Sequence, residues 1–378
     1  MRSCVAARFG IILRKGKNVK RIGIFGGTFN PIHSGHVGVA LKAAAELNLD
    51  RVLVVPAARN PFKEDCGANA LRWTLVEYAC APHPVLEPCD IELKRGAPSY
   101  TIDTVHTVKA QFPDAQLFFI VGEDNISEVS RWREADELAR LVTFVPYQRT
   151  PESSTEIRRR LEAGETVDDL VPETVADFLE VKGVVFDFGG VISLSPLGDG
   201  DRLRTYCESV GLSRRAFDEG WRKYRAMWDG GECSFNELYC LTFANAGLPP
   251  PTPDQLAQLW HFDAEGWVRT LSPVTLSLMK DLKAAGKKIG ILSNMSEDFR
   301  DRLFVPRCAE YIALADAVII SGAERLVKPN RPIYDLAARR LGLTPHELLF
   351  LDDTEANVTA ARRWGWRSHV YHAEVNVV

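Results

Sequence analysis

Short apolar runs alternate with amphipathic segments along the first part of the chain. The runs at 21–25 (RIGIF) and 51–57 (RVLVVPA) are continuously apolar, as in strands buried on both faces of a parallel sheet. The segment 36–47 between them has helical spacing and predicts a crossover helix. Runs at 115–124 and 141–148 predict two more strands. This alternation predicts an open, doubly wound α/β sheet.

A second cycle of strands and helices begins at residue 182. Apolar runs at 183–186, 287–294, 317–320 and 347–353 predict strands, with helical patterns such as 331–342 among them. After the first of these strands, the stretch from about 199 to 273 is helical in period and rich in aromatic residues. The predicted fold class is therefore α/β with two doubly wound, Rossmann-like domains, the second interrupted by a helical insert.

The predicted boundaries follow from these patterns. Residues 21–181 form the first domain and residues 182–378 the second, with a helix at 171–181 leading directly into the second domain. Between Met1 and Arg21 there are seven basic residues and no acidic residue. We interpret residues 1–20 as a disordered tail or the product of an upstream start site; a targeting peptide or a phosphate-attracting arm is the alternative.

Composition narrows the classes of function. The 378 residues are 46% hydrophobic and 25% charged, with a net charge of -4. This balance argues against general binding to nucleic acid or to an anionic membrane, and no apolar run is long enough to cross a bilayer. The eight cysteines show no CxxC spacing, which argues against a zinc site and a disulfide framework and favours reduced thiols in a cytoplasm.

The stretch GGTFNPIHSGH directly follows the first predicted strand. Gly26 and Gly27 would let the backbone approach a phosphate, and a helix that begins near Ser34 would point its N–H groups toward it. His33 and His36 would add donors on the same side. This arrangement suits charge stabilisation at a phosphoryl centre without a covalent nucleophile. A Gly-Gly loop alone is a weak signal, and two histidines alone could be structural.

The same stretch resembles the signature of the nucleotidylyltransferase superfamily, with its HxGH core. Further stretches resemble the bacterial nicotinate-mononucleotide adenylyltransferases in the same order: DIELKRGAPSYTIDTV, LFFIVGED, SRWREADEL and SSTEIRRRL. The resemblance covers about residues 20–181. It implies attack of the nicotinate mononucleotide phosphate on the α-phosphorus of ATP, with Mg²⁺ accompanying the ATP and pyrophosphate released, as a step of NAD biosynthesis.

The resemblance also implies roles for matching residues. His33 and His36 would be catalytic, because they would hold and neutralise the ATP phosphates. Core packing for Trp132, helix capping for Ser153 or Ser154 and a solvated charge for Arg158 are the structural alternatives. The implied substrate-binding residues are Gly26, Gly27, Thr28 and Phe29 in the phosphate loop, Lys63 after the second strand, Tyr100, Thr101 and Trp132 in the pyridine pocket, Gly122 and Asp124 at the ribose, and Ser153, Ser154, Thr155 and Arg158 at an ATP-binding helix start.

Two features depart from the pattern of that family. Phe62 stands where family members usually carry a histidine before the lysine. Between the strand at 141–148 and the stretch SSTEIR there is also no room for the longer segment that family members usually have. The helix carrying Arg158 must then fold back by a shorter route, or the ATP site is distorted.

The second domain places a candidate nucleophile at a strand end. In FDFGGVI, Asp187 follows an apolar strand, and a carboxylate there can attack phosphorus if a metal and a lysine neutralise the charge. Ser293, Lys328 and the pair Asp352 and Asp353 follow in order. Each residue alone has an ordinary structural explanation, such as a turn or a helix cap. Their order after successive strands makes a joint site the better interpretation.

This half resembles the haloacid dehalogenase superfamily over about residues 182–372, and the helical insert resembles its C1-type cap. The resemblance implies an aspartyl phosphate formed on Asp187, stabilised by Lys328. It further implies that Ser293 and Asn294 bind the phosphoryl group and that Mg²⁺ lies between Asp187, the Gly189 carbonyl and Asp353, with Asp352 beside it.

Gly189 departs from the usual pattern, in which a second aspartate stands two residues after the first and acts as general acid and base. Loss of such a group costs about 10²–10⁴ in rate, and the cost falls when the leaving group needs no proton. We therefore expect a preference for good leaving groups, such as acyl or anomeric phosphates. Phosphatases with D-x-G at this site occur in the superfamily, and the stretch 224–238 is expected to face the site and set the substrate.

Together these features predict a bifunctional, cytoplasmic enzyme that acts on small molecules: ATP, nicotinate mononucleotide and a phosphorylated metabolite. Two alternatives stay open. One domain could be a degenerate nucleotide-binding or scaffold module, or the first could transfer the adenylyl group to another acceptor, such as a pantetheine phosphate. The sequence does not fix the oligomeric state.

Overall fold

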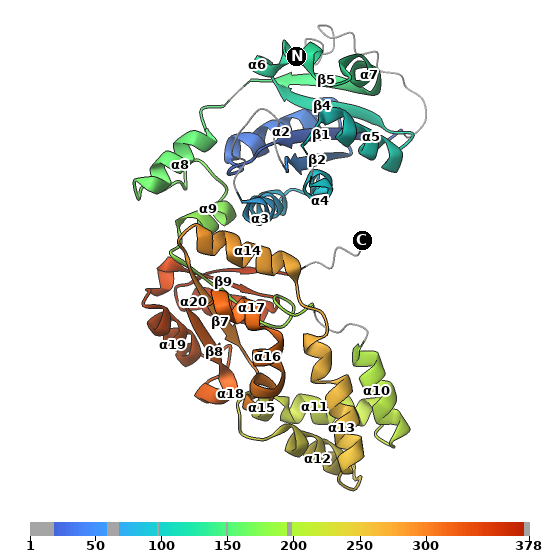
Figure 1. The fold of residues 1–378 in the computed structure, drawn as a ribbon, viewed down its shortest axis with the longest axis vertical. Helices are drawn as coiled ribbons and strands as arrows, with labels where there is room; N and C mark the ends of the chain where they lie inside the picture. The colour runs from blue at the N-terminus through green and yellow to red at the C-terminus, as the bar shows by residue number, and fades with distance from the viewer. Residues whose placement is uncertain (1–18, 59–67, 97, 149, 195–198, 374–378) are drawn as a thin grey trace. The chain divides into compact units, whose positions relative to one another are not determined.

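The computed structural model describes residues 19–58, 68–96, 98–148, 150–194 and 199–373. The chain divides into two compact units after Val175. Each unit contains a five-stranded, all-parallel sheet with helices on both faces (Figure 1). This confirms the predicted fold class of two Rossmann-like α/β domains. No helix in the described ranges is long and apolar enough to span a membrane.

In the first unit the strand order is β3-β2-β1-β4-β5, so that β1 is the middle strand. β1 pairs in parallel with β2 on one side and with β4 on the other. The carboxyl ends of these three strands therefore meet at one edge of the sheet. The strands are β1 Arg21–Gly27, β2 Arg51–Pro56, β3 Leu86–Pro88, β4 Gln116–Gly122 and β5 Val142–Tyr147.

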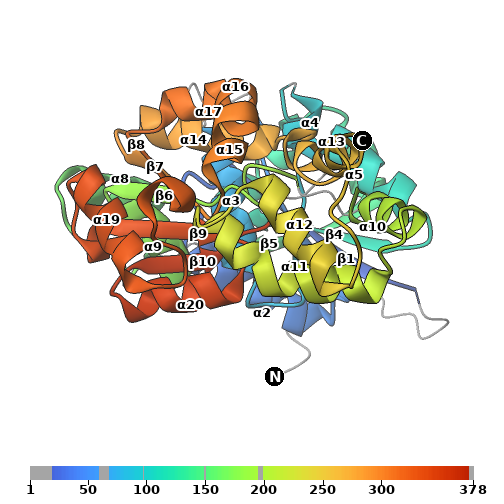
Figure 2. The same ribbon diagram turned by 90° about the horizontal axis from the view of Figure 1, so that it is seen from below.

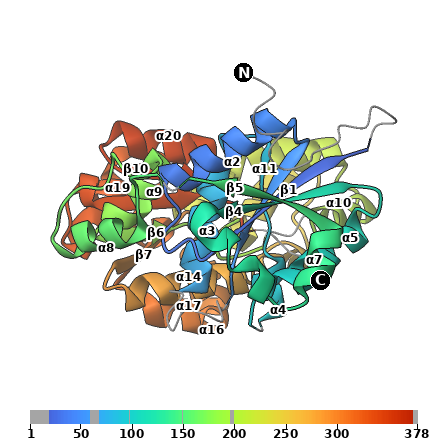
Figure 3. The same cartoon turned by 90° about the horizontal axis from the view of Figure 1, so that it is seen from above.

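The helices of this unit cover both faces of its sheet, with α2 on one face and α5 and α7 on the other (Figure 3). Ile22 and Ile24 of β1 pack into a buried cluster with residues of α5 and α7. Phe25 points to the opposite face, where its ring contacts Phe29 and His36. The helical elements are α2 Ser34–Leu47, α3 Asn69–Cys80, α4 Ile91–Arg95, α5 Thr101–Gln111, α6 Glu123–Ile126, η1 Val129–Arg131, α7 Ala135–Leu141, α8 Ser154–Glu162 and α9 Glu173–Glu180.

The second sheet has the order β10-β9-β6-β7-β8, again with the first strand of the unit in the middle. It lies between α14 and α17 on one side and α19 and α20 on the other (Figure 2). The strands are β6 Gly183–Phe186, β7 Lys288–Ser293, β8 Ala317–Ile320, β9 Leu348–Asp352 and β10 Arg367–Val370. The helical elements of this layer are α14 Pro273–Ala284, α15 Glu297–Phe299, η3 Arg300–Phe304, α16 Val305–Arg307, α17 Ala309–Leu314, α18 Ser321–Glu324, α19 Arg331–Leu341, η4 Pro345–Glu347 and α20 Glu355–Arg363.

The helical insert after β6 is present as predicted and is called the cap below. It consists of α10 Asp199–Ser209, α11 Arg214–Asp229, α12 Phe235–Asn245, α13 Pro253–Phe262 and η2 Glu265–Val268. The chain segments that lead into the cap and out of it lie side by side, since the Leu194 N–H donates to the Thr270 carbonyl at 3.0 Å. Asp298 of the sheet layer accepts hydrogen bonds from Trp228 Nε1 and from the Phe235 N–H, both at 3.0 Å.

The structure also contains elements that the sequence did not predict. The edge strands β3 and β10 were missing from the predicted set. The division after Val175 falls inside α9, because the rest of that helix packs on the second unit: Asp177 bonds His369 Nε2 at 2.7 Å and Glu180 pairs with Arg367 at 3.0 Å. Lys63 and most of the predicted N-terminal tail lie outside the described residues.

Candidate active sites

The loop after β1 turns directly into α2, as predicted. His33 is the N-cap residue of α2, which begins at Ser34. The glycine at position 27 has a steric reason, because a Cβ atom on Gly27 would lie 2.8 Å from the ring of Phe29. Phe29 itself has a positive φ of 47° and is buried. The loop thus folds back on its own aromatic residue and is tied to the core.

The two histidines cap the helix reciprocally. The His33 N–H donates to His36 Nδ1 at 3.2 Å, and the His36 N–H donates to His33 Nδ1 at 3.4 Å. The rings stack with centroids 3.5 Å apart. A ring nitrogen that accepts carries no proton, so the neutral tautomer of each imidazole has its proton on Nε2. Both rings can therefore donate from Nε2 to a phosphate oxygen.

Burial explains the charge state of the deeper ring. His33 is 6% exposed, and burial lowers its pKa to about 4, although the Glu152 carboxylate acts in the opposite direction. His33 is therefore neutral near pH 7 and would hold a phosphate as a hydrogen-bond donor rather than as a cation.

The start of α2 differs from the expectation of unpaired N–H groups. The Ser34 N–H donates to the Leu170 carbonyl at 3.0 Å, and the His36 N–H is directed to His33. Part of the donor capacity of this helix start is thus satisfied inside the protein. The Nε2 atoms of the imidazoles become correspondingly more important for binding a phosphate.

The short connection before α8 does not prevent that helix from reaching the phosphate loop. Ser153 caps α8, accepting from the Glu156 N–H at 3.1 Å, as the capping interpretation predicted. Ser154 Oγ donates to the Pro31 carbonyl at 3.0 Å, and Arg158 Nη1 donates to the Asn30 carbonyl at 2.6 Å. The segment with Thr155 and Arg158 thus lies against the loop by the shorter route.

The same short connection also brings a carboxylate to the loop. A side chain at Gly35 would overlap the Thr150 hydroxyl and would approach Glu152 Oε2 to 3.0 Å. Glu152 has a lowered pKa, first because of its hydrogen bond with Thr150 and also because of His33. A polyphosphate bound at the histidines would meet this negative charge, so binding requires Glu152 to move or a cation to lie between them.

Arg72 of α3 is a positioning residue that the sequence analysis missed. It is 2% exposed, and its guanidinium donates to the Thr28 carbonyl at 2.6 Å and to the Ala57 carbonyl at 2.7 Å. It therefore joins the phosphate loop to the end of β2. No local sequence pattern around Arg72 marks this role, because the two carbonyls that it joins belong to residues 44 and 15 positions away in the chain.

The residues expected at the pyridine and the ribose lie at the ends of α5 and β4. Tyr100 is the N-cap residue of α5, makes no side-chain capping bond, and has the Arg133 guanidinium 5.1 Å above its ring. Trp132 packs edge-on against Phe119 and Phe144, so its ring is held by the core. Thr101 begins α5.

At the end of β4, Gly122 accommodates the side chain that folds back over it. A Cβ atom at Gly122 would lie 2.5 Å from Asp124 Oδ1. Gly122 is the last residue of β4 and the N-cap of α6. Asp124 therefore stands at the same sheet edge as the phosphate loop.

The second unit gathers its charged groups around Lys328. Its ammonium lies 2.7 Å from Asp187 Oδ1 and 2.7 Å from Asp352 Oδ2. All three side chains are almost fully buried. Asp187 follows β6 and Asp352 ends β9, the strand paired with β6.

The two adjacent aspartates have different tasks. Asp352 Oδ1 accepts from the Thr354 N–H at 2.8 Å and from Asn357 Nδ2 at 3.1 Å, while Oδ2 accepts from Lys328. Asp352 is therefore fully engaged inside the protein. Asp353 instead lines the cavity beside Asp187. Asn357 was not predicted, and its role becomes visible only in the fold.

The carboxylates fit a divalent cation. Oxygen atoms of Asp187, Asp352 and Asp353 lie within 4.8 Å of one another. Lys328 is paired with the buried carboxylates of Asp187 and Asp352, and the half-buried Asp353 adds a third carboxylate close by, so negative groups outnumber the ammonium. Oxygen donors are the ligands that Mg²⁺ prefers, and Asp187 and Asp353 are the residues that would hold it.

The pKa shifts reflect this imbalance. Burial raises the pKa of Asp187 to about 7 against the opposing effect of Lys328. Burial also raises the pKa of Asp353, with a further contribution from Asp352. For Lys328, burial acts to lower the pKa, but the Asp187 and Asp352 carboxylates outweigh it and the pKa is raised. An added cation at the carboxylates would favour their ionised forms.

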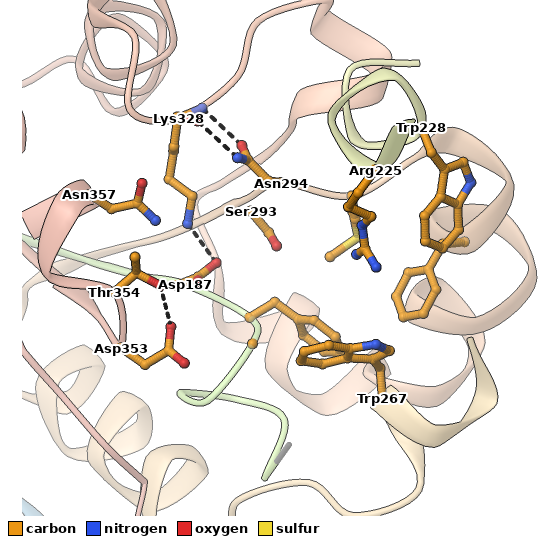
Figure 4. Close-up of a pocket in the computed structure, with 14 residues that line it drawn as sticks. Asp187, Arg225, Trp228, Trp267, Ser293, Asn294, Lys328, Asp353, Thr354 and Asn357 are labelled. Carbon is orange, nitrogen blue, oxygen red and sulfur yellow. Dashed lines mark hydrogen bonds and ion pairs between the residues drawn. The ribbon is translucent and has the colours of Figure 1, made fainter. Parts of the chain in front are cut away.

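A cavity of about 250 Å³ opens over these groups. Figure 4 shows Asp187, Lys328 and Asp353 on one side and Arg225, Trp228 and Trp267 on the other. Arg225 and Trp228 come from the stretch of the cap that the sequence analysis expected at the site.

Two predicted phosphoryl-binding residues differ in their contacts. Ser293, the last residue of β7, is 3% exposed and lines the cavity. Asn294 braces Lys328: its Oδ1 accepts from the Lys328 N–H at 2.9 Å and its Nδ2 donates to the Lys328 carbonyl at 3.0 Å. The structure therefore gives the Asn294 side chain a positioning contact.

The two glycines after Asp187 have different neighbours. A Cβ atom at Gly189 would lie 3.2 Å from Cζ3 of Trp267, so the indole of the cap packs where a second aspartate would extend. Gly190 has a φ of 68°, and a side chain there would overlap the Asp353 carboxylate. Gly190 thus permits the close approach of Asp353 to the nucleophile loop.

Fold and geometry together define two phosphate-directed sites, each at the carboxyl edge of a parallel sheet. The first places neutral imidazoles at a glycine loop and a helix start, as a nucleotidyl-transfer enzyme requires. The second places a carboxylate beside a lysine and a cation-binding pair, as a phosphoryl-transfer hydrolase requires.

Comparisons with known proteins agree with these two classes. A cytidylyltransferase-like family model matches residues 24–162, and a haloacid dehalogenase-like hydrolase family model matches residues 181–365. The chain is 37% identical over 189 residues to the probable nicotinate-nucleotide adenylyltransferase of Shouchella clausii, covering 45% of this chain and 98% of that protein. It is 39% identical over 183 residues to the probable nicotinate-nucleotide adenylyltransferase of Thermus thermophilus, covering 43% of this chain and 98% of that protein.

Among solved structures, a predicted HAD-like family hydrolase from Porphyromonas gingivalis covers 52% of this chain and 94% of its own, with 21% identity and a TM-score of 0.39. The chain belongs to the nicotinate-nucleotide adenylyltransferase family and carries a haloacid dehalogenase-like hydrolase domain in the same polypeptide. It is an enzyme with both domains.

We expect NMR of the histidine rings to show His33 neutral, protonated on Nε2 and without titration above about pH 5 in the folded chain, assigned with a His33→Gln variant. In denaturant the same ring should titrate near its ordinary pKa of about 6.5. The pKa is lower in the folded state, so the stability from His33 is present above about pH 6.5 and is lost as the pH falls toward 4. The loss should reach roughly 3 kcal/mol at most. A folded-state pKa near 6.5 would contradict this prediction.

Replacing Lys328 with Met should strongly destabilise the second unit, because Asp187 and Asp352 would remain buried without their cation. We expect a loss of about 3–5 kcal/mol, measured as hydrogen-exchange protection of β6 and β9. The double variant Lys328→Met/Asp352→Asn should recover part of it. Lys283→Met, which removes an exposed ion pair with Asp316, is the control and should cost about 1 kcal/mol or less. Equal effects of the two single variants would refute the central role of Lys328.

Proposed function

We propose that the first unit transfers the adenylyl group of ATP to nicotinate mononucleotide, forming deamido-NAD and pyrophosphate. The observation that carries this proposal is the pair of neutral, stacked imidazoles at the start of α2, beside the phosphate loop. The curated relatives named above are probable nicotinate-nucleotide adenylyltransferases, which supports the choice of acceptor.

In the proposed reaction a phosphate oxygen of the mononucleotide attacks the α-phosphorus of ATP. The bond from that phosphorus to the oxygen shared with the β-phosphate breaks, and pyrophosphate leaves with the electron pair. His33 and His36 donate from Nε2 to the phosphate oxygens and so stabilise the negative charge that develops. Neither histidine needs to change its protonation state. Arg72 and Arg158 hold the loop through the Thr28 and Asn30 carbonyls.

We further propose that the second unit hydrolyses a small phosphorylated metabolite in a Mg²⁺-dependent reaction. Mg²⁺ would be held by Asp187 and Asp353 and would supply charge neutralisation at the phosphoryl group. An Asp187 oxygen attacks phosphorus, and the bond from phosphorus to the leaving oxygen breaks. Lys328 stabilises the charge on the phosphoryl group. Water then attacks the aspartyl phosphate, which regenerates Asp187 and yields inorganic phosphate.

The packing at Gly189 supports a preference for good leaving groups. No carboxyl group stands two residues after Asp187, and the Trp267 indole packs where one would extend. A leaving oxygen must therefore depart with its negative charge or take a proton from solvent. Acyl phosphates satisfy this condition and simple alkyl phosphates do not.

The first activity is tested with the purified full chain, ATP, Mg²⁺ and nicotinate mononucleotide, by chromatographic detection of the dinucleotide. His36→Ala should lower kcat/KM about 10²–10³-fold, because it removes a donor to the phosphates. His106→Ala is the matched control, since His106 is exposed on α5 and pairs with Glu137. A folded wild-type chain that binds ATP but forms no dinucleotide would refute the proposal and favour a degenerate first domain. If product forms with nicotinamide mononucleotide or a pantetheine phosphate but not with nicotinate mononucleotide, the proposed acceptor is wrong.

The second activity is tested by phosphate release from acetyl phosphate and ethyl phosphate in the presence of Mg²⁺. We expect kcat/KM for acetyl phosphate to be at least about 10²-fold higher, and Asp187→Asn to abolish turnover of both. Asp301→Asn, which alters an exposed ion pair with Arg300, should leave both rates unchanged. Equal rates for the two substrates would overturn the leaving-group argument, and full activity of Asp187→Asn would overturn the role of Asp187 as nucleophile.

A further inference from the structure

The cavity of the second unit has a second polar pole, opposite the carboxylates. Its members are on the cap, and Figure 4 shows Arg225 reaching into the cavity from α11 while Trp267 lies across from it. Lys328 and Arg225 are the two cationic side chains among the residues that line this cavity. Lys328 is paired with two carboxylates, Asp187 and Asp352, whereas Arg225 is paired with one, Asp229, and reaches into the cavity from the cap side.

The Arg225 guanidinium is held in a fixed position. Its Nε donates to Asp229 Oδ1 at 2.8 Å, and its Cζ atom lies 4.5 Å from the centroid of the Trp228 ring and 4.6 Å from that of the Trp221 ring. Trp228 is itself anchored through Nε1 to Asp298. Because the side chain is already ordered, a ligand would not have to immobilise it.

The donors that remain on Arg225 point into the cavity. Within the part of the chain that the structure describes, Asp229 is the residue that accepts a hydrogen bond from this guanidinium, through Nε. Figure 4 shows the end of the Arg225 side chain directed into the cavity, and its Nη nitrogens would match the two oxygens of a carboxylate or the edge of a phosphate. The buried Asp263 carboxylate also interacts with this guanidinium, since the charge of Arg225 acts against the rise that burial causes in the pKa of Asp263. The Arg225 side chain is 23% exposed, so water competes only partly for these donors.

We propose that the substrate of the hydrolase is a small phosphorylated acid, whose second anionic group binds Arg225 while its phosphoryl group lies at Asp187. This inference rests on the proposed hydrolase function and adds the substrate class. The cavity of about 250 Å³ limits the carbon skeleton to a few atoms between the two poles. Trp267 and Phe299 provide apolar walls for that skeleton.

The test measures binding, so that it does not depend on turnover. The Asp187→Asn full chain is titrated calorimetrically, in buffer with Mg²⁺, with phosphoglycolate and with phosphoglycolamide. The two probes have the same size and differ in the charge at the far end. We expect phosphoglycolate to bind at least ten-fold more tightly, because the amide offers one acceptor oxygen and no charge.

Variants of α11 assign the difference to Arg225. In the same background Arg225→Gln should bring the two dissociation constants within about two-fold, and Arg225→Lys should give an intermediate ratio because the fork is lost but the charge remains. Arg222→Gln is the matched control, since Arg222 is exposed on the same helix, and should keep the ten-fold preference. Hydrogen exchange across α11 verifies that the variants are folded.

The outcomes distinguish failure of the anion site at Arg225 from failure of the proposed hydrolase function. If inorganic phosphate binds but phosphoglycolate binds no better than its amide, the second anion site is refuted and the hydrolase function stands. If the preference persists in Arg225→Gln, Arg225 is not its source and the inference fails. If the wild-type chain releases no phosphate from acetyl phosphate, the proposed hydrolase function fails, and the substrate class fails with it.

Discussion

Both sites depend on one constraint of parallel sheets: strands that run in the same direction end at the same edge. β1 and β6 are the middle strands of their sheets, so each ends between two neighbours. In the second unit Asp187 follows β6, while Ser293 ends β7 and Asp352 ends β9. In the first unit the phosphate loop follows β1, and Gly122 ends β4. Residues that are distant in the chain thus converge without any long-range loop to carry them.

The carboxyl edges of the two sheets are suited to different reactions because the side chains gathered there differ in charge. The first site uses two stacked imidazoles, of which His33 is neutral near pH 7, and the reciprocal cap between His33 and His36 places the proton of a neutral ring on Nε2. It can bind developing negative charge without a proton transfer. The second site buries Asp187 and Asp352 around Lys328, with Asp353 beside them, which would keep the proposed nucleophile close to a stabilising cation. Adenylyl transfer needs only positioning and charge stabilisation, whereas hydrolysis through an aspartyl phosphate needs a covalent group.

The sequence predicted what local pattern and chain order control. Continuous apolar runs identified β1, β2 and β4 because strands buried on both faces are almost wholly apolar. The edge strand β5 is only partly buried, but its sequence is still mostly apolar and was recognised for that reason. β10 was not predicted because RSHV is short and three of its four residues are polar, and β3 was not predicted because it has only three residues. The start of α2 and the cap at Ser153 were predictable because capping is local.

Contacts between distant segments could not be predicted in the same way. Arg72 bonds the Thr28 and Ala57 carbonyls, Asn357 bonds Asp352, and Arg225 faces a cavity whose other wall comes from four strand ends and loops. In the sequence each of them is an ordinary polar residue on an amphipathic helix, and only the fold shows which distant group its side chain contacts. The contact between α8 and the phosphate loop could not be predicted either, because only the folded chain shows that the short connection before α8 is long enough for it.

The cap supplies what the core of the second site lacks. With Gly189 two residues after Asp187, the proposed nucleophile, no side chain at that position can protonate a leaving group, and Trp267 packs into part of that space. Binding energy from a remote group can instead be used to align the reacting bond. An arginine held by Asp229 and Trp228 at the far end of a small cavity is placed for that purpose, since it can fix the leaving portion while Asp187 attacks along the opposite direction. Selectivity and catalysis at this site would then come from the same contact.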